Sequence, residues 1–172
     1  MAVSEKPELG MLAETPFGRG LSPGDLQKVA DISTSVQVNA ETLLFQEGSH
    51  ADQLYLVIRG KVGLEICLPR KGCIRILTVG PGEFLGWSAI VGRGDMTTRA
   101  KILEPTTLVV LPGEQVKALC ESDHDIGYRV MQQVAVGLSQ RLLATRLQML
   151  DVFDETQPIR PPDFTSATNA GD

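Results

Sequence analysis

Residues 80–100 read GPGEFLGWSAIVGRGDMTTRA, and the interpretation of the whole chain starts from this stretch. Its pattern is that of a strand, a tight glycine turn, one helical turn from about Trp87, an arginine at position 93 between two glycines, and a return strand. Free N–H groups at the start of a helical turn, together with a nearby guanidinium, can hold a small phosphate. The stretch therefore predicts an anion-binding loop, with an ordinary surface loop as the alternative.

Short apolar runs separated by turn residues lie on both sides of this loop. They occupy residues 42–45, 53–58, 62–68, 74–79, 99–103 and 107–111. Many short strands at this spacing are typical of an antiparallel roll or barrel. We therefore predict an α+β fold built on an antiparallel, jelly-roll-like β-roll.

Helix signals precede and follow the strands. The Ser22-Pro23 pair predicts the start of a short helix that ends near Ile32. A second short helix is expected at residues 112–120. A capping signal at residues 122–125 is followed by a proline-free helical pattern to Phe153. This C-terminal helix should be about 28 residues long, or roughly 42 Å.

The long helix carries two apolar stripes. The first contains Met131, Ala135, Leu138, Leu142 and Met149, and the second contains Val136, Leu143, Leu147 and Leu150. Two stripes predict two partners, the β-roll and a second copy of the helix, and therefore a homodimer. The alternative is a helix that only crosses its own roll. Arg129, Arg141 and Arg146 are the only charged residues between Ile126 and Leu150, so the helix is a candidate to face an anion, although a solvated face is the commoner explanation.

Composition excludes several classes of protein. The chain has 172 residues, of which 42% are apolar, as expected for one globular domain. Sixteen Lys and Arg against 21 Asp and Glu give a net charge of −5, which provides no general attraction for nucleic acid. No apolar run approaches the ~18 residues that span a bilayer, and the first thirty residues lack a signal-peptide core. We therefore expect a cytoplasmic protein that binds neither nucleic acid nor membrane.

The chain divides into three parts. Residues 1–20 are punctuated by proline and glycine and are predicted to be an N-terminal tail. Residues 21–153 form the predicted domain, including the long helix. Residues 154–172 lack periodicity and are predicted to be a disordered tail.

Residues that could carry catalysis are scarce. His50 and His124 lie far apart in the sequence, and neither belongs to a cluster with metal-ligand spacing. Motifs for a nucleophilic serine, a phosphate-binding loop or a Cys/His pair are absent from the sequence. We therefore expect the protein not to be an enzyme and to need neither a metal nor a cofactor.

The three cysteines have no C-x-x-C spacing. Matching the apolar faces of the two strands around residues 69–72 pairs Leu68 with Ile74, which puts Cys67 opposite Arg75. In this register Cys73 is a diagonal neighbour of Cys67 at about 7 to 8 Å, beyond easy disulfide reach. We therefore expect reduced, mostly structural thiols.

A set of motifs within the strands supports a more specific interpretation. They are FQEGSHADQLYLV at 45–57, GKV at 60–62, PGEF at 81–84, Gly86, and RA at 99–100. From about residue 21 to residue 152 the chain resembles the cyclic-nucleotide-binding domain of the Crp/Fnr and protein-kinase-A regulatory-subunit superfamily. The resemblance implies a β-roll flanked by helices, with residues 86–99 as the phosphate-binding cassette and the long helix as lid and dimer interface.

The cassette departs from the pattern of the cyclic AMP binders in this family. Those members have a glutamate that accepts a hydrogen bond from the ribose 2′-hydroxyl, whereas here Trp87 follows Gly86. Gly94 stands where their phosphate-binding arginine is expected, so Arg93 is the candidate to replace it, although Asp95 beside it would repel a phosphate. The cassette is also shorter. We therefore expect cyclic AMP to bind weakly.

Two further departures lie outside the cassette. The family's base-contacting hydroxyl residues map, within about one turn, onto Arg141 and Leu142, so the usual adenine contact is not reproduced. Bacterial transcription factors of this family continue after a segment like residues 147–152 into a winged helix-turn-helix, whereas only about twenty residues follow here. The N-terminal cysteine cluster of oxygen-sensing members is also missing from this sequence.

Together these observations predict a stand-alone regulatory or sensor module. It would bind a cyclic nucleotide or similar anionic small molecule and signal through a homodimer to an unknown protein partner. The residues expected to line the ligand site are Gly86, Trp87, Ser88, Ala89, Arg93, Gly94, Thr97, Thr98 and Arg141. An interaction protein that kept the fold and lost ligand binding is the alternative. A DNA-binding regulator is a third hypothesis, which the acidic charge and the length of the chain both disfavour.

Overall fold

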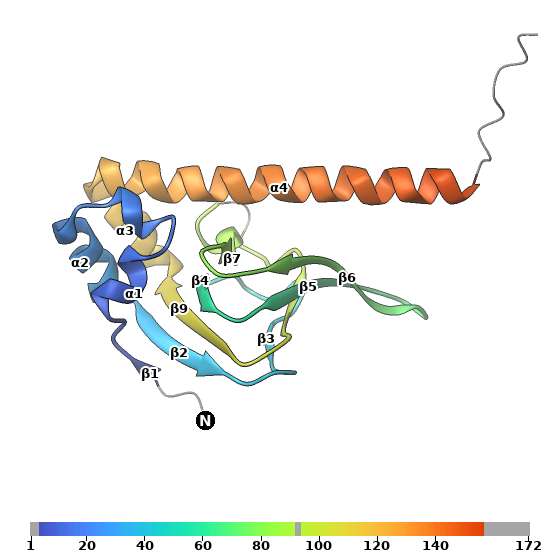
Figure 1. The fold of residues 1–172 in the computed structure, drawn as a ribbon, viewed down its shortest axis with the longest axis horizontal. Coiled ribbons are helices and arrows are strands. Elements are labelled where there is room, and N and C mark those ends of the chain that lie inside the picture. The colour runs from blue at the N-terminus through green and yellow to red at the C-terminus, as the bar shows by residue number, and fades with distance from the viewer. Residues whose placement is uncertain (1–3, 92–93, 157–172) are drawn as a thin grey trace, which may run out of the picture.

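Two antiparallel β-sheets form the centre of the structure (Figure 1). The computed structural model describes residues 4–91 and 94–156, with side chains up to residue 147. In order across the first sheet, the strands are β1 (Ser4–Glu5), β2 (Thr34–Val38), β9 (Thr106–Pro112), β4 (Gln53–Arg59) and β7 (Phe84–Leu85). In order across the second sheet, they are β3 (Leu43–Phe45), β8 (Arg99–Ile102), β5 (Val62–Leu68) and β6 (Gly72–Val79). The predicted α+β fold with an antiparallel β-roll is confirmed.

Every apolar run that predicted a strand lies in one of these strands. Two strands, β1 and β2, were not predicted, whereas β7 is the short strand expected before the turn at Gly86. The β2 sequence TSVQV has only two apolar residues and is partly buried. Strand β1 contains two residues, which is too short for a strand periodicity to be visible.

The inner faces of the two sheets pack against each other. Val62 and Leu64 of β5, and Ala100 and Ile102 of β8, are fully buried and belong to one hydrophobic cluster with Leu108 of β9. Side chains alternate between the two faces of a strand. The residues between these positions therefore point to the outer face of the second sheet.

The two shorter predicted helices begin where their sequence signals lie. Helix α2 (Pro23–Asp31) follows Ser22, whose Oγ accepts a hydrogen bond from the Asp25 N–H at 3.2 Å. Helix α3 (Gly113–Ser122) follows β9, and Pro112 is its N-cap residue. Both helices lie at the same end of the roll (Figure 1).

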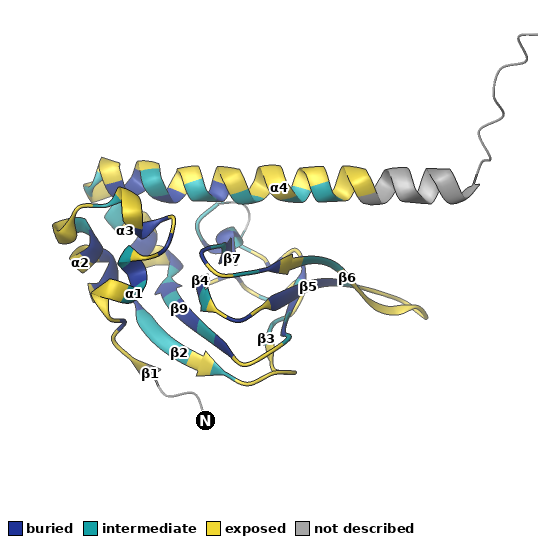
Figure 2. Cartoon of the chain, in the orientation of Figure 1, coloured by how far each residue is buried: buried dark blue, intermediate teal, exposed yellow. Residues whose placement is uncertain are grey.

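Helix α4 (His124–Thr156) crosses the roll and extends past it (Figure 1). Asp123 caps its start, because Oδ1 accepts a hydrogen bond from the Ile126 N–H at 3.2 Å. Ile126, Val130 and Val134 are buried on one face, whereas the apolar side chains farther along are exposed (Figure 2). The exposed residues include Leu138, Leu142, Leu143 and Leu147. Among the described helices, none combines the length and hydropathy needed to cross a membrane.

Residues 4–20 differ from the predicted tail, because they pack onto the roll. They contain β1, α1 (Leu9–Ala13) and the short helix η1 (Gly18–Gly20). Leu12 is 0% exposed and Phe17 is 2% exposed, and the Phe17 ring packs edge-on against Phe84 with 5.3 Å between centroids. Burying these two side chains contributes roughly 1.5–3 kcal/mol each. The isolated apolar residues between prolines and glycines gave no periodic signal for this packing.

The β5–β6 hairpin is closed more tightly than predicted. Leu68 pairs with Gly72 rather than with Ile74, so Cys67 faces Cys73 directly. The Cα atoms of the two cysteines are 3.9 Å apart, and their sulfurs form a disulfide bond. The expectation of reduced thiols is therefore wrong for this pair. Between Glu65 and Leu68 the two registers differ by two residues, which leaves these side chains on the same face, so matching the apolar faces could not distinguish them.

Candidate functional site

The loop after β7 begins at Gly86, whose φ is +78°. A Cβ atom at this position would lie 2.7 Å from the Gln53 carbonyl oxygen, so only glycine lets the loop pass this close to β4. The short helix η2 (Trp87–Ala89) follows at once. The helical turn predicted to start near Trp87 is confirmed.

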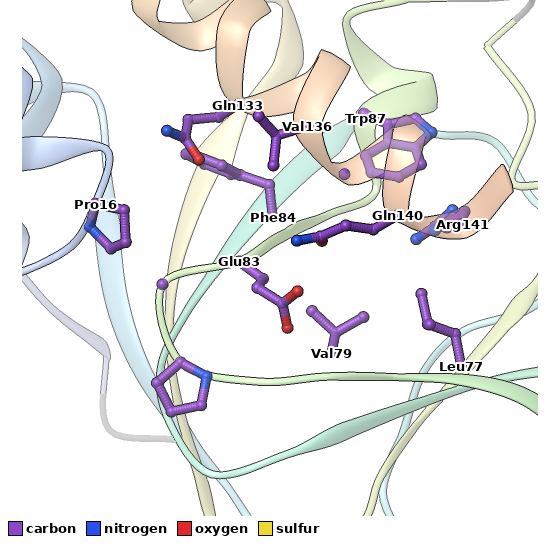
Figure 3. Close-up of a pocket in the computed structure, with 13 residues that line it drawn as sticks. Pro16, Leu77, Val79, Glu83, Phe84, Trp87, Gln133, Val136, Gln140 and Arg141 are labelled. Carbon is purple, nitrogen blue, oxygen red and sulfur yellow. The ribbon is translucent and has the colours of Figure 1, made fainter. Parts of the chain in front are cut away.

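The Trp87 side chain lies between this loop and α4. It is 7% exposed. Gly137 of α4 makes room for the ring, because a Cβ atom there would lie 2.7 Å from Trp87 Cζ3. One helical turn farther along α4, Arg141 places its guanidinium carbon 3.7 Å from the centre of the indole (Figure 3). The indole is therefore in contact with two successive turns of α4.

Arg141 is a half-buried cation. Burial lowers the pKa of its guanidinium to about 10, and the negative charge of Glu83 opposes this effect. The side chain therefore stays protonated at neutral pH. Among the ion pairs of the described residues, none includes Arg141. Its positive charge is in contact with the face of an aromatic ring instead.

A cavity of about 240 Å³ lies beside Trp87 and Arg141, between α4 and the segment that joins β6 to β7 (Figure 3). Its polar lining residues are Glu83, Gln133, Gln140 and Arg141, and its apolar lining includes Leu77, Val79, Phe84 and Val136. Glu83 Oε2 accepts a hydrogen bond from the Gly80 N–H at 2.6 Å, which fixes this carboxylate. The cavity thus combines one cation, one carboxylate and two amides with an apolar wall.

The predicted cassette itself encloses very little space. Six of the predicted ligand-site residues line a common gap of about 10 Å³, namely Gly86, Trp87, Ser88, Thr97, Thr98 and Arg141. That volume holds at most about one water molecule. Among the described residues, a lining side chain such as Trp87 or Arg141 would have to move for a small molecule to enter this gap.

Of the other three predicted site residues, Ala89 and Gly94 line a different cavity. Ala89 is buried against α3, where a Cβ atom on Gly113 would lie 2.7 Å from the Ala89 carbonyl oxygen. Gly94 accepts a hydrogen bond from the Ala51 N–H at 2.7 Å and lines a separate cavity of about 120 Å³. Arg93 lies outside the described residues. The structure therefore does not bring Ala89 or Gly94 to the gap beside Trp87.

Apart from Trp87 and Arg141, the residues that line the larger cavity were not predicted as site residues from the sequence. Gln133, Gly137, Gln140 and Arg141 follow each other at spacings of four, three and one, so they share one face of α4. This spacing could have identified the cavity-lining face of α4. The signal is weak, because only Arg141 carries a charge and glutamines are common on solvated helix surfaces. Within the described residues, no group of three or more His, Cys, Asp or Glu side chains could hold a metal ion.

Comparison of the sequence with known proteins identifies a family and one curated relative. The family described as "Cyclic nucleotide-binding domain" matches residues 35–123. A curated relative from Rhodopseudomonas palustris, provisionally named as a potassium channel protein, is 27% identical over 141 residues. The match covers 82% of this chain and 34% of the relative, so the chain spans about one third of that protein's length.

Solved structures give the same result for the fold. A protein of Geobacter metallireducens, provisionally named as a cyclic nucleotide-binding protein, is 25% identical, with a TM-score of 0.69, covering 79% of this chain and 98% of that one. The catabolite activator protein of Thermus thermophilus is also 25% identical, with a TM-score of 0.64, covering 81% of this chain and 63% of that one.

Proposed function

Because the chain belongs to the cyclic nucleotide-binding domain family, we propose that it is a regulatory module that senses a small, nucleotide-like anion. The ligand would occupy the 240 Å³ cavity between α4 and the segment joining β6 to β7, with its anionic group on Arg141. One observation carries this proposal. Arg141 is a half-buried, protonated cation that faces a ring and lies at the edge of an open cavity.

The energetics favour an exchange of partners at Arg141. A guanidinium over an indole gains about 0.5–2 kcal/mol, depending on how far it is desolvated. A hydrogen bond to a charged group gains about 1.5–3 kcal/mol, and a guanidinium can make two such bonds to one phosphate. An anion in the cavity would therefore draw Arg141 away from Trp87. The freed indole face could then stack on a base.

The polar lining narrows the class of ligand. Gln133 and Gln140 can each donate and accept hydrogen bonds, as the edge of a nucleobase requires. The Glu83 carboxylate would repel a second negative charge close to Arg141. A ligand with a single negative charge, such as a cyclic phosphodiester, therefore fits the cavity better than a nucleoside triphosphate.

Cyclic AMP itself should be a poor ligand in the mode used by the family. In the family members that bind cyclic AMP, a glutamate accepts a hydrogen bond from the ribose 2′-hydroxyl. Trp87 stands at the position of that glutamate in this chain. Leaving that hydroxyl unpaired costs roughly 1–3 kcal/mol, which corresponds to about 5- to 150-fold in affinity. Arg93 remains a candidate for a second cationic contact.

Helix α4 would carry the output. Trp87 and Arg141 link the loop to α4, so a ligand that separates them changes how firmly α4 is held. The exposed residues Leu138, Leu142, Leu143 and Leu147 would pack against the same helix of a second copy. The signal would then pass to a protein partner, and we assign the module neither a catalytic step nor DNA reading of its own.

A second function is favoured by the size of the cassette gap. If Trp87 and Arg141 permanently fill the space that a ligand would occupy, the gap stays at about 10 Å³. Helix α4 would then stay packed on the loop without any nucleotide. The protein would then act as an interaction module that kept the fold and lost ligand binding.

Native mass spectrometry of freshly purified protein separates the two functions. The sensor proposal predicts a bound small molecule, or an adduct after adding cyclic AMP, cyclic GMP or a cyclic dinucleotide. The adduct should be lost in Arg141→Gln and retained in Arg146→Gln, which removes an exposed charge from the same helix. Absence of any adduct across all these nucleotides would favour the interaction module instead.

A further inference from the structure

The disulfide between Cys67 and Cys73 lies at the turn end of the β5–β6 hairpin. The two residues are a directly facing pair on the outer face of the second sheet. Both are exposed to solvent. Small reactants can therefore reach these sulfurs without any opening of the fold.

A cation lies beside this disulfide. The Arg99 side chain comes from β8, and its Nη1 is 3.2 Å from Cys73 Sγ and 3.9 Å from Cys67 Sγ. Arg99 Nε lies 3.5 Å from the Glu65 carboxylate, which orients the guanidinium towards the sulfurs. The environment of the two cysteines is therefore asymmetric, with the positive charge closer to Cys73.

We propose that Cys67 and Cys73 are a reversible thiol–disulfide pair that reacts with hydroperoxides. Cys73 is the attacking sulfur, Cys67 is the resolving sulfur, and Arg99 is the cation that stabilises the thiolate of Cys73. This inference does not depend on the nucleotide site. It gives the module a second input, at the opposite face of the sheet from the hydrophobic cluster that Val62 and Leu64 help to form.

The oxidation is balanced by the two sulfurs and one hydroperoxide. The Cys73 thiolate attacks the terminal peroxide oxygen, an S–O bond forms, and the O–O bond breaks, releasing an alkoxide that takes a proton from water. Cys73 is then a sulfenic acid, oxidised by two electrons. The Cys67 sulfur attacks it, the S–S bond forms, the S–O bond breaks, and the hydroxide leaves as water with the Cys67 proton.

The return step needs a small-molecule thiol such as glutathione. Its thiolate attacks the Cys67 sulfur, because Cys73 is then the leaving group and a nearby cation stabilises the departing thiolate. A second molecule of the thiol releases Cys67 as a free thiol. The balance is two thiols oxidised to one small-molecule disulfide and one protein disulfide reduced.

Cys120 provides an internal reference. It lies on α3, it is partly buried, and its sulfur is free. Burial, together with the negative charge of Glu121, raises the pKa of its thiol. Cys120 should therefore react much more slowly than Cys73 in the same molecule.

Trypsin makes the reaction easy to follow. Arg70 and Lys71 lie between the two cysteines, so digestion separates them into peptides 62–70 and 72–75. The full chain is reduced with dithiothreitol, desalted, treated with hydrogen peroxide, and alkylated at intervals before digestion. We expect the linked peptide pair to appear first and Cys120 to remain alkylated. Oxidation of Cys120 at the same rate as Cys73 would overturn the proposal.

Variants test the assigned roles. Cys67→Ser should stop the reaction at a sulfenic acid on Cys73, which dimedone traps, whereas Cys73→Ser should leave Cys67 reacting about ten-fold more slowly. Arg99→Gln should slow the oxidation of Cys73 by about the same factor. Lys101→Gln removes a charge from the same strand and should leave the rate unchanged. Equal rates for the two single-cysteine variants, or an unchanged rate in Arg99→Gln, would contradict the proposal.

Discussion

Arg141 lies over Trp87, with 3.7 Å between the guanidinium carbon and the ring centre, and this contact joins α4 to the loop that follows β7. Family members that bind cyclic AMP are expected to use the two corresponding positions for ribose and base. Here the two side chains contact each other instead. The contact makes α4 and the loop one unit, and it leaves the 240 Å³ cavity beside it.

The close packing of Trp87 on α4 is testable at Gly137. Gly137→Ala adds a methyl group at a point 2.7 Å from Trp87 Cζ3, so the rigid ring or the helix must shift. We expect the free energy of unfolding to fall by roughly 1–3 kcal/mol, measured by urea denaturation with circular dichroism. Gly10→Ala is the matched control, because it adds the same group to helix α1 with nothing within 4 Å. Equal stabilities for the two variants would show that the Trp87 contact is not tightly packed.

The loss of the ribose acceptor is testable at Trp87. Trp87→Glu restores a carboxylate at this position and removes the bulky ring from the cassette gap. We expect cyclic AMP affinity to rise by about 5- to 150-fold over the wild type in calorimetric titrations. Trp87→Gln opens the same space without the charge and should gain much less. A Trp87→Glu variant that binds cyclic AMP no better than the wild type would argue against the assigned position of the ribose.

The exposed apolar side chains of α4 lead us to predict dimerisation through this helix. Leu143→Glu combined with Leu147→Glu should convert a dimer to monomers, because each places a charge where the second helix would pack. Light scattering at tens of micromolar measures the mass. The control adds glutamate at the exposed polar residues Gln37 and Gln115, which lie on β2 and α3 rather than on α4, and should leave the dimer intact. A monomeric wild type at this concentration is incompatible with the proposed interface.

The start of α4 gives a prediction for pH. Hydrogen bonds from Lys28 and from the Ile126 N–H hold the pKa of Asp123 below its ordinary value of 3.8. A carboxylate with a lowered pKa contributes stability above its ordinary pKa, and this contribution is lost as the pH falls through the lowered value. The wild type should therefore lose more stability below pH 3.8 than Asp123→Asn, which keeps a capping oxygen but cannot ionise. Parallel acid denaturation curves for the two proteins would contradict this.

Local periodicity was sufficient to predict much of the fold. Strand runs such as residues 53–58 and 62–68 alternate or are continuously apolar between clear turns, and Ser22 and Asp123 both cap the helices they precede. What could not be predicted depends on contacts between distant segments. Leu12 lies in an apolar patch too short to show a period and Phe17 is flanked by Pro16 and Gly18, and their segment is held on the roll by the burial of Leu12 and the packing of Phe17 on Phe84.

Two errors have a more specific physical origin. The hairpin register was wrong because a two-residue shift preserves both faces of a strand, and the choice is made by the turn, where Arg70 and Gly72 adopt positive φ values of 68° and 77°. The cavity was missed because its polar lining combines Glu83 with neutral glutamines on α4, and neither signal is distinctive alone. Arg141 was predicted, because it is one of three charges between Ile126 and Leu150 and maps near the family's base-contacting position.

The most direct test of the sensor proposal is the fluorescence of Trp87, the only tryptophan in the chain. Cyclic AMP, cyclic GMP and cyclic dinucleotides are titrated into the wild type, Arg141→Gln, Arg93→Ala and the control Arg146→Gln. The account predicts a saturable change in emission for at least one nucleotide, weakened at least about ten-fold in Arg141→Gln and unchanged in Arg146→Gln. No saturable change with any nucleotide, or tight binding that Arg141→Gln leaves unaffected, would contradict it.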